Sequence, residues 1–356
     1  MITSVQIHGY RGFDNFELNG LGRINLLVGP NNGGKTSVLE AIYILMAEGD
    51  PAALWNVLER RGEMVTTENS GSVIPRREAD VRHLFRGHEF VRSGRFKIEA
   101  GGRSESRYLS ANVATMPPEK RSELRKLGDA EAAAVGLGLG LNVDLLNAIY
   151  WLPLSRSGGI REESRGSNGA SGRKNQVLIP AGSLTTDELV RIWDRVQLTE
   201  QEILVLQALR LVDPNIERIS ARLGSVKGII VKIKDLDQPV PIGSLGDGMW
   251  RILALAVALM QSRGGVLLVD EIDTGLHHSV MSEMWQFVFK TAKVFDVQVF
   301  ATTHSYDCVY SLAHICAEAD DKNPITVQRI EPGKTKAIPY AQDEIRIAAD
   351  REIEVR

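Results

Sequence analysis

Eight residues near the N-terminus have the types and spacing of a phosphate-binding loop. Residues 29–36 read Gly-Pro-Asn-Asn-Gly-Gly-Lys-Thr and match G-x-x-x-x-G-K-[ST] at every fixed position. Backbone N–H groups of such a loop and of the following helix bind an anion, and glycines let the backbone approach phosphate closely. Lys35 would reach the β- and γ-phosphates, and the Thr36 hydroxyl would ligate Mg²⁺. The expected nucleotide contacts are Gly29, Pro30, Asn31, Asn32, Gly33, Gly34, Lys35, Thr36 and Ser37.

Two carboxylates directly follow an apolar stretch in the second half of the chain. Residues 266–269 are β-forming, and Asp270 and Glu271 come next. Open α/β sheets bind ligands at the carboxyl ends of their strands, so Asp270 is expected to ligate Mg²⁺ and Glu271 to activate water as a general base. Without the phosphate loop, solvated acids at the end of an edge strand would explain the pattern better.

Two other segments carry candidate contacts to phosphate. Ser244-Leu245-Gly246-Asp247-Gly248 precedes an apolar helix, whose N-terminus would again present N–H groups. His304 follows an expected strand and lies 33 residues after Glu271. Taken singly, the first segment reads as an ordinary glycine-rich helix start, and a lone histidine is most often a structural or surface residue. A role in phosphate binding becomes the better interpretation of both segments only because the chain also carries the phosphate loop.

The elements that must position these residues alternate between strands and helices. Residues 24–28, the loop and a helix over 35–48 form one strand–loop–helix unit. Strands at 266–269 and 297–301, with a helix from His278 between them, imply a parallel pair with a right-handed crossover. The other expected elements are strands at 4–8, 13–18, 96–99, 108–110 and 228–233, and helices at 187–211, with Asp187 as N-cap, and 250–261.

Composition places the chain among globular proteins. Of its 356 residues 43% are hydrophobic and 24% charged, which argues against a disordered or membrane-embedded chain. The longest wholly apolar run, 252–260, is far too short to span a bilayer. Cys308 and Cys316 are too few and too unfavourably spaced for a disulfide framework or a four-ligand zinc site. A cytoplasmic protein with two reduced thiols is the simplest expectation.

The charge is distributed unevenly along the chain. The net charge is -3, yet residues 76–174 carry 18 Lys or Arg against 12 Asp or Glu. We therefore expect a nucleotide-binding core over 1–48 and 177–356 and an inserted basic lobe over 49–176, with a flexible Gly/Ser-rich loop near 155–174. A basic segment in an acidic body is typical of a surface that contacts an anionic partner such as DNA or RNA. A solvated face paired with acids elsewhere explains it equally well.

These segments together resemble the ABC ATPase superfamily, and within it the stand-alone AAA-type ATPases of the OLD-like group. The resemblance spans nearly the whole chain, and its segments occur in the expected order: 29–36, Leu-Phe-x-Gly at 84–87, Gly-Ser-Leu-Gly-Asp-Gly at 243–248, Asp-Glu-Ile-Asp-Thr-Gly-Leu-His at 270–277 and Thr-Thr-His-Ser at 302–305. It implies an α/β fold: an ABC-type P-loop ATPase head with a mixed, largely parallel sheet flanked by helices, an N-terminal antiparallel β portion and an inserted helical and β lobe.

The resemblance also assigns roles to single residues. Two subunits would sandwich ATP, with Ser244, Gly246 and Gly248 acting in trans on the partner's nucleotide and His304 contacting the γ-phosphate. Gln176 is the nearest candidate for the Q-loop residue that senses Mg²⁺. Arg11, in a Tyr-Arg-Gly-Phe turn resembling that of RecF and SMC ATPases, would approach the nucleotide. A plain turn residue is an equal alternative for Arg11.

The leading hypothesis is a Mg²⁺-dependent ATPase that dimerises around ATP and regulates a separate effector. Many OLD-like proteins carry a C-terminal Toprim nuclease, for which the 52 residues after His304 are too few. The resemblance therefore implies an effector such as a nuclease on another polypeptide, and a role in bacterial anti-phage defence. The alternative is a RecF-like DNA-binding ATPase in repair or recombination, whose basic segment contacts phosphates through Arg76, Arg77, Arg82, Arg86, Arg92 and Arg95.

Other nucleotide-binding classes fit less well. A transporter ATPase is disfavoured because no membrane span is encoded. SMC proteins place long coiled coils between the P-loop and the signature, whereas only 207 residues without heptads separate Thr36 from Ser244. A GTPase is disfavoured because no N-K-x-D motif occurs.

Overall fold

The structure is a computed structural model of the 356-residue chain. It describes residues 1–67, 76–89, 94–102, 105–127, 129–144, 149–165, 175–222, 228–318 and 324–351.

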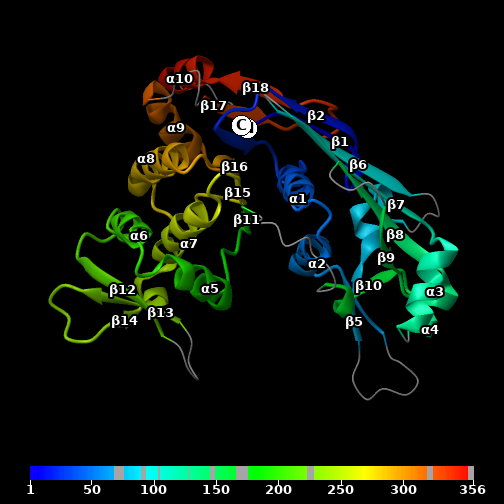
Figure 1. The fold of residues 1–356 in the computed structure, drawn as a ribbon. Coiled ribbons are helices and arrows are strands. Elements are labelled where there is room, and N and C mark those ends of the chain that lie inside the picture. Colours follow the sequence, from blue (N-terminus) through cyan, green and yellow to red (C-terminus); the bar gives the residue numbers. More distant parts are fainter. Residues whose placement is uncertain are drawn as a thin grey trace.

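A six-stranded sheet lies at the centre of the molecule (Figure 1). Its order is β11-β15-β16-β3-β17-β18, and all neighbours run parallel except β17 and β18. Every residue of β3, β15 and β16 is buried, as expected for parallel strands covered on both faces. The strands are β3 (Ile24–Val28), β11 (Gln176–Ile179), β15 (Val266–Val269), β16 (Gln298–Thr302), β17 (Ile325–Arg329) and β18 (Ile338–Ala341).

A second, antiparallel sheet of six strands packs beside the first, in the order β2-β1-β6-β7-β8-β9. Its first two strands come from the chain start and the other four from residues 95–153, so part of the expected insertion is hydrogen-bonded directly to β1. The division into core and inserted lobe stays a prediction. The strands are β1 (Ile2–Tyr10), β2 (Phe13–Asn19), β6 (Arg95–Gly102), β7 (Ser106–Thr115), β8 (Leu137–Val143) and β9 (Tyr150–Pro153).

Two three-stranded sheets and short helical turns complete the β structure. One sheet has the order β10-β5-β4 and the other β12-β13-β14. Their strands are β4 (Met64–Thr67), β5 (Arg76–Asp80), β10 (Gly159–Arg161), β12 (Ile216–Arg222), β13 (Gly228–Ile233) and β14 (Val240–Pro241). The 3₁₀ turns are η1 (Val81–Leu84), η2 (Arg86–His88), η3 (Glu162–Arg165), η4 (Ile242–Leu245) and η5 (Cys316–Glu318).

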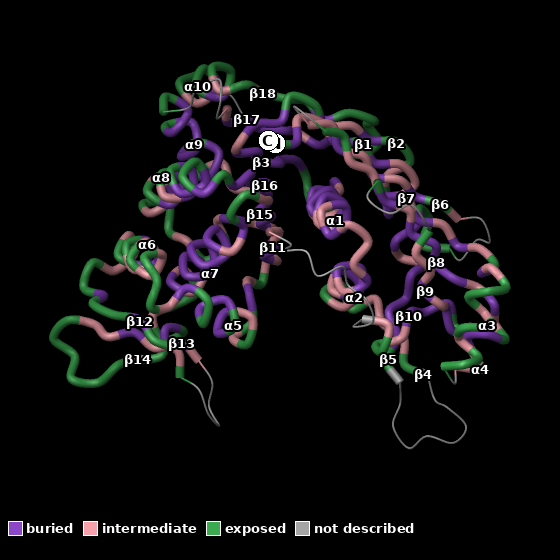
Figure 2. Tube along the Cα trace, in the orientation of Figure 1, coloured by how far each residue is buried: buried purple, intermediate pink, exposed green. Residues whose placement is uncertain are grey.

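Helices cover both faces of the central sheet, and their apolar residues form two cores. On one side, α1 lies between the two large sheets, where Leu39 and Ile42 pack with Ile7 and Leu268. On the other, α5, α7, α8 and α9 pack against β15 and its neighbours; Figure 2 shows α1 and α7 as mostly buried. The helices are α1 (Lys35–Met46), α2 (Pro51–Arg60), α3 (Pro118–Lys126), α4 (Ala130–Val135), α5 (Thr186–Val196), α6 (Gln201–Leu209), α7 (Asp247–Gln261), α8 (His278–Val294), α9 (Tyr306–Ile315) and α10 (Gln342–Asp350).

The helix expected over 187–211 is two helices in the structure. The chain leaves α5 after Val196, and Leu198 adopts a φ of 62°, which ends a right-handed helix. The N-cap is Thr185 rather than Asp187, because Thr185 and Glu188 form a reciprocal capping box. Apolar periodicity alone does not reveal a break of this kind.

Two other expectations concern loops and membrane spans. The flexible loop expected near 155–174 contains β10 and η3 in its first part, and residues 166–174 lie outside the described residues. None of the helices in the described part of the chain has the length and apolarity needed to span a membrane.

Candidate functional site

The loop over 29–36 leads from β3 into α1 and borders a hollow of 330 Å³. Gly34 has a φ of 95°, and a Cβ there would lie 2.4 Å from the Phe13 ring, so this position requires glycine. The hollow is lined by Asn31, Asn32, Gly33, Gly34, Lys35, Thr36, Ser37, Arg61, Asp270, Glu271 and His304. Residues from three neighbouring strands of the central sheet thus meet at its carboxyl edge, as the sequence predicts.

The Lys35 side chain is buried against the loop that precedes it. Its Nζ donates to the carbonyls of Gly29 and Pro30, both at 2.8 Å, and lies 3.4 Å from His304 Nδ1. Burial lowers the pKa of Lys35, while Asp270 and Glu271 act in the opposite direction. The ammonium is thus held beside the space where a phosphate would enter.

Asp270 is surrounded by hydroxyl groups at the end of β15. Its carboxylate accepts from Thr36 Oγ1 at 3.0 and 3.1 Å and from Thr302 Oγ1 at 2.7 Å. Carboxylate and hydroxyl oxygens are the ligands that Mg²⁺ prefers, and two of them already meet here. Thr36 and Asp270 therefore suit the metal proposed for this site.

Glu271 and His304 lie side by side at the rim of the hollow. His304 Nε2 is 3.6 Å from Glu271 Oε1, and both side chains are about 40% exposed. The Glu271 N–H donates to Thr302 Oγ1, and its φ of 49° is unusual for a residue with a side chain. The backbone thereby turns out of the strand and leaves the carboxylate accessible to water.

A buried arginine connects α7, the helix that follows residues 244–248, to Asp270 and Glu271. Arg251, in α7, is 1% exposed, and its guanidinium donates to the backbone carbonyls of Asp270, Glu271 and Pro180. Burial lowers the pKa of Arg251 to about 10. α7 is thus hydrogen-bonded to the chain segments that directly follow β11 and β15. In the sequence, Arg251 is recognisable only as an arginine within an apolar helix, and nothing local predicts these hydrogen bonds.

Ser244, Gly246 and Gly248 lie outside this hollow. Ser244 is in η4, Gly246 is the exposed N-cap of α7, and Gly248 packs on the segment after the acidic pair. A Cβ on Gly248 would lie 2.6 Å from the carbonyl oxygen of Gly275. Within a single subunit the structure does not bring these residues to the P-loop.

Gln176 and Arg11 are not brought to the hollow either. Gln176 opens β11 opposite Val266, at the far end of the strand from Asp270, so its amide does not join the Thr36–Asp270 pair. Arg11 is 3% exposed and forms two hydrogen bonds with Glu63, at 2.7 and 3.0 Å. Neither residue lines the hollow, because strand register and buried ion pairs hold them elsewhere.

Arg61 reaches the hollow instead, and sequence reasoning missed it. It follows α2, and its Nε donates to the buried Glu40 at 2.7 Å. Glu40, on α1, also lies 2.8 Å from Arg11 Nε, so one carboxylate ties both arginines to the P-loop helix. Burial raises the pKa of Glu40, whereas the two guanidinium groups oppose that rise. No local signal in the sequence distinguishes Arg61 from Arg60.

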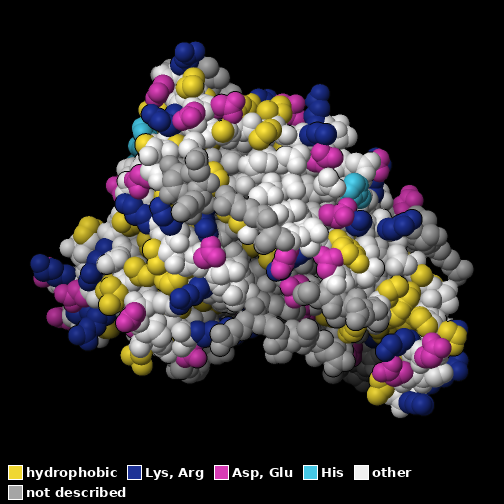
Figure 3. Space-filling model, turned by 45° about the horizontal axis from the view of Figure 1, so that its top comes forward, with side chains coloured by type: hydrophobic (Ala, Val, Ile, Leu, Met, Phe, Trp, Pro, Cys, Tyr) yellow, Lys and Arg dark blue, Asp and Glu magenta, His cyan; other side chains and the backbone are white. Residues whose placement is uncertain are grey.

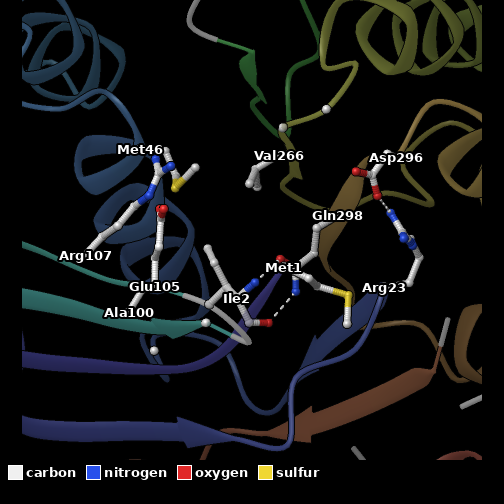
Figure 4. Close-up of a pocket in the computed structure, with 14 residues that line it drawn as sticks. Met1, Ile2, Arg23, Met46, Ala100, Glu105, Arg107, Val266, Asp296 and Gln298 are labelled. Carbon is white, nitrogen blue, oxygen red and sulfur yellow. Dashed lines mark hydrogen bonds and ion pairs between the residues drawn. The ribbon is translucent and has the colours of Figure 1, made fainter. Parts of the chain in front are cut away.

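A second hollow lies at the amino edge of the central sheet (Figure 4). Val266 and Gln298, which open β15 and β16, line it together with Ile2. The Gln298 amide exchanges hydrogen bonds with the backbone of Ile2, and Arg23 pairs with Asp296 at 2.8 Å. These polar contacts hold the first strand on the sheet, far from the candidate catalytic residues.

Comparisons with known proteins agree with this geometry. A family profile described as "AAA domain, putative AbiEii toxin, Type IV TA system" matches residues 24–307. The chain is 23% identical over 348 residues to a Helicobacter pylori protein named ATP/GTP phosphatase, and the match covers 90% of each chain. A shorter match, 41% identical over 44 residues and 12% of each chain, is to the DNA replication and repair protein RecF of Bacillus mycoides.

Solved SMC head domains share the fold. The SMC head bound to the C-winged helix domain of ScpA superposes with a TM-score of 0.53 at 11% identity, covering 96% of this chain and 97% of that one. The SMC head of Pyrococcus furiosus, with an extended coiled coil, gives 0.52 at 11% identity and 99% of both chains. The ABC-type P-loop ATPase fold predicted from the sequence is confirmed.

Proposed function

The chain belongs to this AAA domain family within the ABC, SMC and RecF superfamily of ATPases, and from that premise we propose that it is an ATP-hydrolysing molecular switch. The observation that carries the proposal is the meeting of Lys35, Thr36, Asp270, Glu271 and His304 around one hollow. These residues lie in segments that follow the carboxyl ends of three adjacent strands, and each matches a part that phosphoryl transfer to water requires.

The chain's own residues divide the chemistry among them. Lys35 exchanges the carbonyls of Gly29 and Pro30 for phosphate oxygens, and its charge offsets the negative charge that grows on the γ-phosphate. Glu271 takes a proton from the attacking water, and His304 beside it contacts the γ-phosphate. Thr36 and Asp270 would hold Mg²⁺, which supplies further charge stabilisation when bound.

We propose that two subunits complete the site. Ser244 and Gly246 are exposed at the N-terminus of α7, where N–H groups favour an anion, yet they lie outside the hollow of their own subunit. A partner subunit that presents this segment to the γ-phosphate would make closure depend on ATP. Hydrolysis would then reopen the dimer.

The biological role that we propose for the switch follows from the resemblance to OLD-like ATPases. We propose that dimer closure regulates a separate cytoplasmic effector, such as a nuclease, in bacterial anti-phage defence. Support comes from the order of the five sequence segments and from the toxin-related description of the matching family. The effector would contact surfaces that move when the dimer opens and closes.

The RecF-like alternative, a DNA-binding ATPase, has weaker support from the basic segment. Arg77 pairs with Glu59 at 3.1 Å, and Arg86 pairs with Asp14 at 2.9 Å. Asp80 binds Arg82, while Arg92 and the side chain of Arg76 lie outside the described residues. On the face shown in Figure 3, basic and acidic side chains are interspersed. Intramolecular pairing accounts for much of the local positive charge.

Substitution of Glu271 by glutamine tests the proposed function. Loss of the general base is expected to slow hydrolysis by about 100-fold or more while ATP still binds. The variant should form a dimer with ATP that gel filtration or light scattering detects. Glu283→Gln, an exposed change on α8, serves as the control. Unchanged turnover together with an ATP-independent size would refute the proposal.

Replacing Arg61 by alanine is expected to weaken ATP binding by about 10-fold or more, since a hydrogen bond to a charged group contributes about 1.5–3 kcal/mol. Titration with a fluorescent ATP analogue measures the change. Arg86→Ala removes a surface ion pair away from the hollow and should leave affinity unchanged. Equal affinities for both variants would show that Arg61 does not contact the nucleotide.

A further inference from the structure

A separate polar hollow of 240 Å³ lies between α2 and α5, beside the start of β11. In Figure 1, the two helices face each other across that strand. The hollow shares no residue with the P-loop hollow. Its lining consists of Tyr43, Asn56, Arg60, Gln176, Val177, Leu178, Leu184, Glu188, Arg191, Ile192, Arg195 and Gln261.

Three arginines and one carboxylate give this hollow an excess of positive charge. Glu188 already accepts from Arg60 at 2.9 Å and from the N–H of Thr185 at 2.8 Å. Arg191 and Arg195 are exposed, and neither forms an ion pair within the described part of the chain. Like charges four residues apart on a helix destabilise it by about 0.2–0.5 kcal/mol. Arg191 Nε donates to the backbone carbonyl of Asp187 at 3.1 Å, but two arginines without a carboxylate partner among the described residues still line one space.

The hollow is also preorganised and offers uncharged hydrogen-bonding groups. Arg60 Nη1 donates to the carbonyl of Leu178 at 2.8 Å, which fixes the guanidinium against the edge of the central sheet. The amides of Gln176 and Gln261 line the same space, and Gln261 Oε1 is buried with no hydrogen-bond partner among the residues that the structure describes. Buried acceptors normally have a partner, so this atom suits a ligand that brings a donor.

We propose that this hollow binds the phosphate of a nucleotide, either free or within a nucleic-acid strand. Guanidinium groups match phosphate oxygens with paired hydrogen bonds, which accounts for the arginines. The amides would meet the ribose hydroxyls or base edges, which carry donors as well as acceptors. Gln176, which does not reach the P-loop hollow, acquires a role in this second site.

The end of α2 connects the two sites. Arg60 lines this hollow, and the next residue, Arg61, lines the P-loop hollow. A phosphate that draws Arg60 away from Glu188 would shift the last turn of α2 and thereby Arg61. This coupling rests on the proposed ATPase function, whereas binding of the second phosphate does not.

The test separates the second site from the first by using a Lys35→Ala background, in which the P-loop no longer holds nucleotide. Probes are inorganic phosphate, AMP and a fluorescent single-stranded DNA of about 10 nucleotides. In that background, adding Arg191→Ala and Arg195→Ala is expected to weaken binding by about 10-fold or more. For the strand, it should also flatten the dependence on salt by about 1.4 in the log–log slope.

Arg218→Ala with Arg222→Ala is the matched control, because these two arginines lie on one strand, β12, and outside the hollow. Circular dichroism verifies that all variants are folded. Tight binding of DNA alone identifies a strand as the source of the phosphate, whereas competition by AMP identifies a free nucleotide. Equal loss in both double variants, or no binding of any probe, would overturn the proposal.

Discussion

Replacing Lys35 by alanine is expected to reduce ATP binding and hydrolysis by about 100-fold or more. Lys35 is 5% exposed, and its ammonium lies between the P-loop carbonyls and His304. Two hydrogen bonds from a charged donor to phosphate contribute about 1.5–3 kcal/mol each, and every 1.4 kcal/mol corresponds to a factor of ten. Calorimetric titration with ATP and a phosphate-release assay measure the two effects.

The same substitution should cost little thermal stability. Burial lowers the pKa of Lys35, so holding the charged ammonium costs folding free energy, which the alanine variant regains. That gain offsets part of the cost of leaving the carbonyls of Gly29 and Pro30 without their donor. Lys97→Ala, a surface change 43% exposed, controls for the loss of one positive charge. If K35A binds ATP as the parent protein does, the loop over 29–36 is not the nucleotide site.

Substitution of Arg251 by leucine is expected to destabilise the protein by about 3 to 5 kcal/mol. Its guanidinium is the donor for carbonyl groups that follow β11 and β15, and leucine would leave these acceptors buried without partners. Each unsatisfied buried acceptor costs about 1–3 kcal/mol. Denaturant unfolding followed by circular dichroism measures the shift in midpoint.

Arg251→Lys separates the contribution of charge from that of hydrogen-bond geometry. Lysine keeps the charge but does not reproduce the planar fork that reaches Pro180 and Asp270 together. We expect its stability to fall between those of the parent and the leucine variant. A leucine variant within about 1 kcal/mol of the parent would mean that water satisfies these carbonyls.

The parts of the site that were predictable from sequence are those coded by contiguous residues. The P-loop pattern itself identifies the residues that are expected to contact the nucleotide. The apolar run at 266–269 predicts a strand that ends just before Asp270. Parallel pairing then brings β15 and β16 together, so His304 arrives beside Glu271. Each step uses a local pattern together with a general rule of sheet topology.

The rest depends on contacts between distant residues. Arg61 reaches the hollow because Glu40, on another helix, holds it, and Arg11 is buried because Glu63 binds it. Gln176 lies at the amino edge because it opens β11 and pairs with Val266 in parallel register, a pairing that the sequence alone does not specify. Such pairings form only once the tertiary structure exists, and no spacing along the chain encodes them.

The order of strands in the central sheet has a consequence for biosynthesis. β3 precedes the P-loop, yet its two neighbours, β16 and β17, lie about 270 and 300 residues further along the chain. At roughly 5–20 residues per second, a ribosome needs roughly 15 to 60 s to deliver them. The antiparallel pairs of β1 close much earlier. We therefore expect nucleotide affinity only after β16 and His304, which complete the lining of the hollow, have been synthesised.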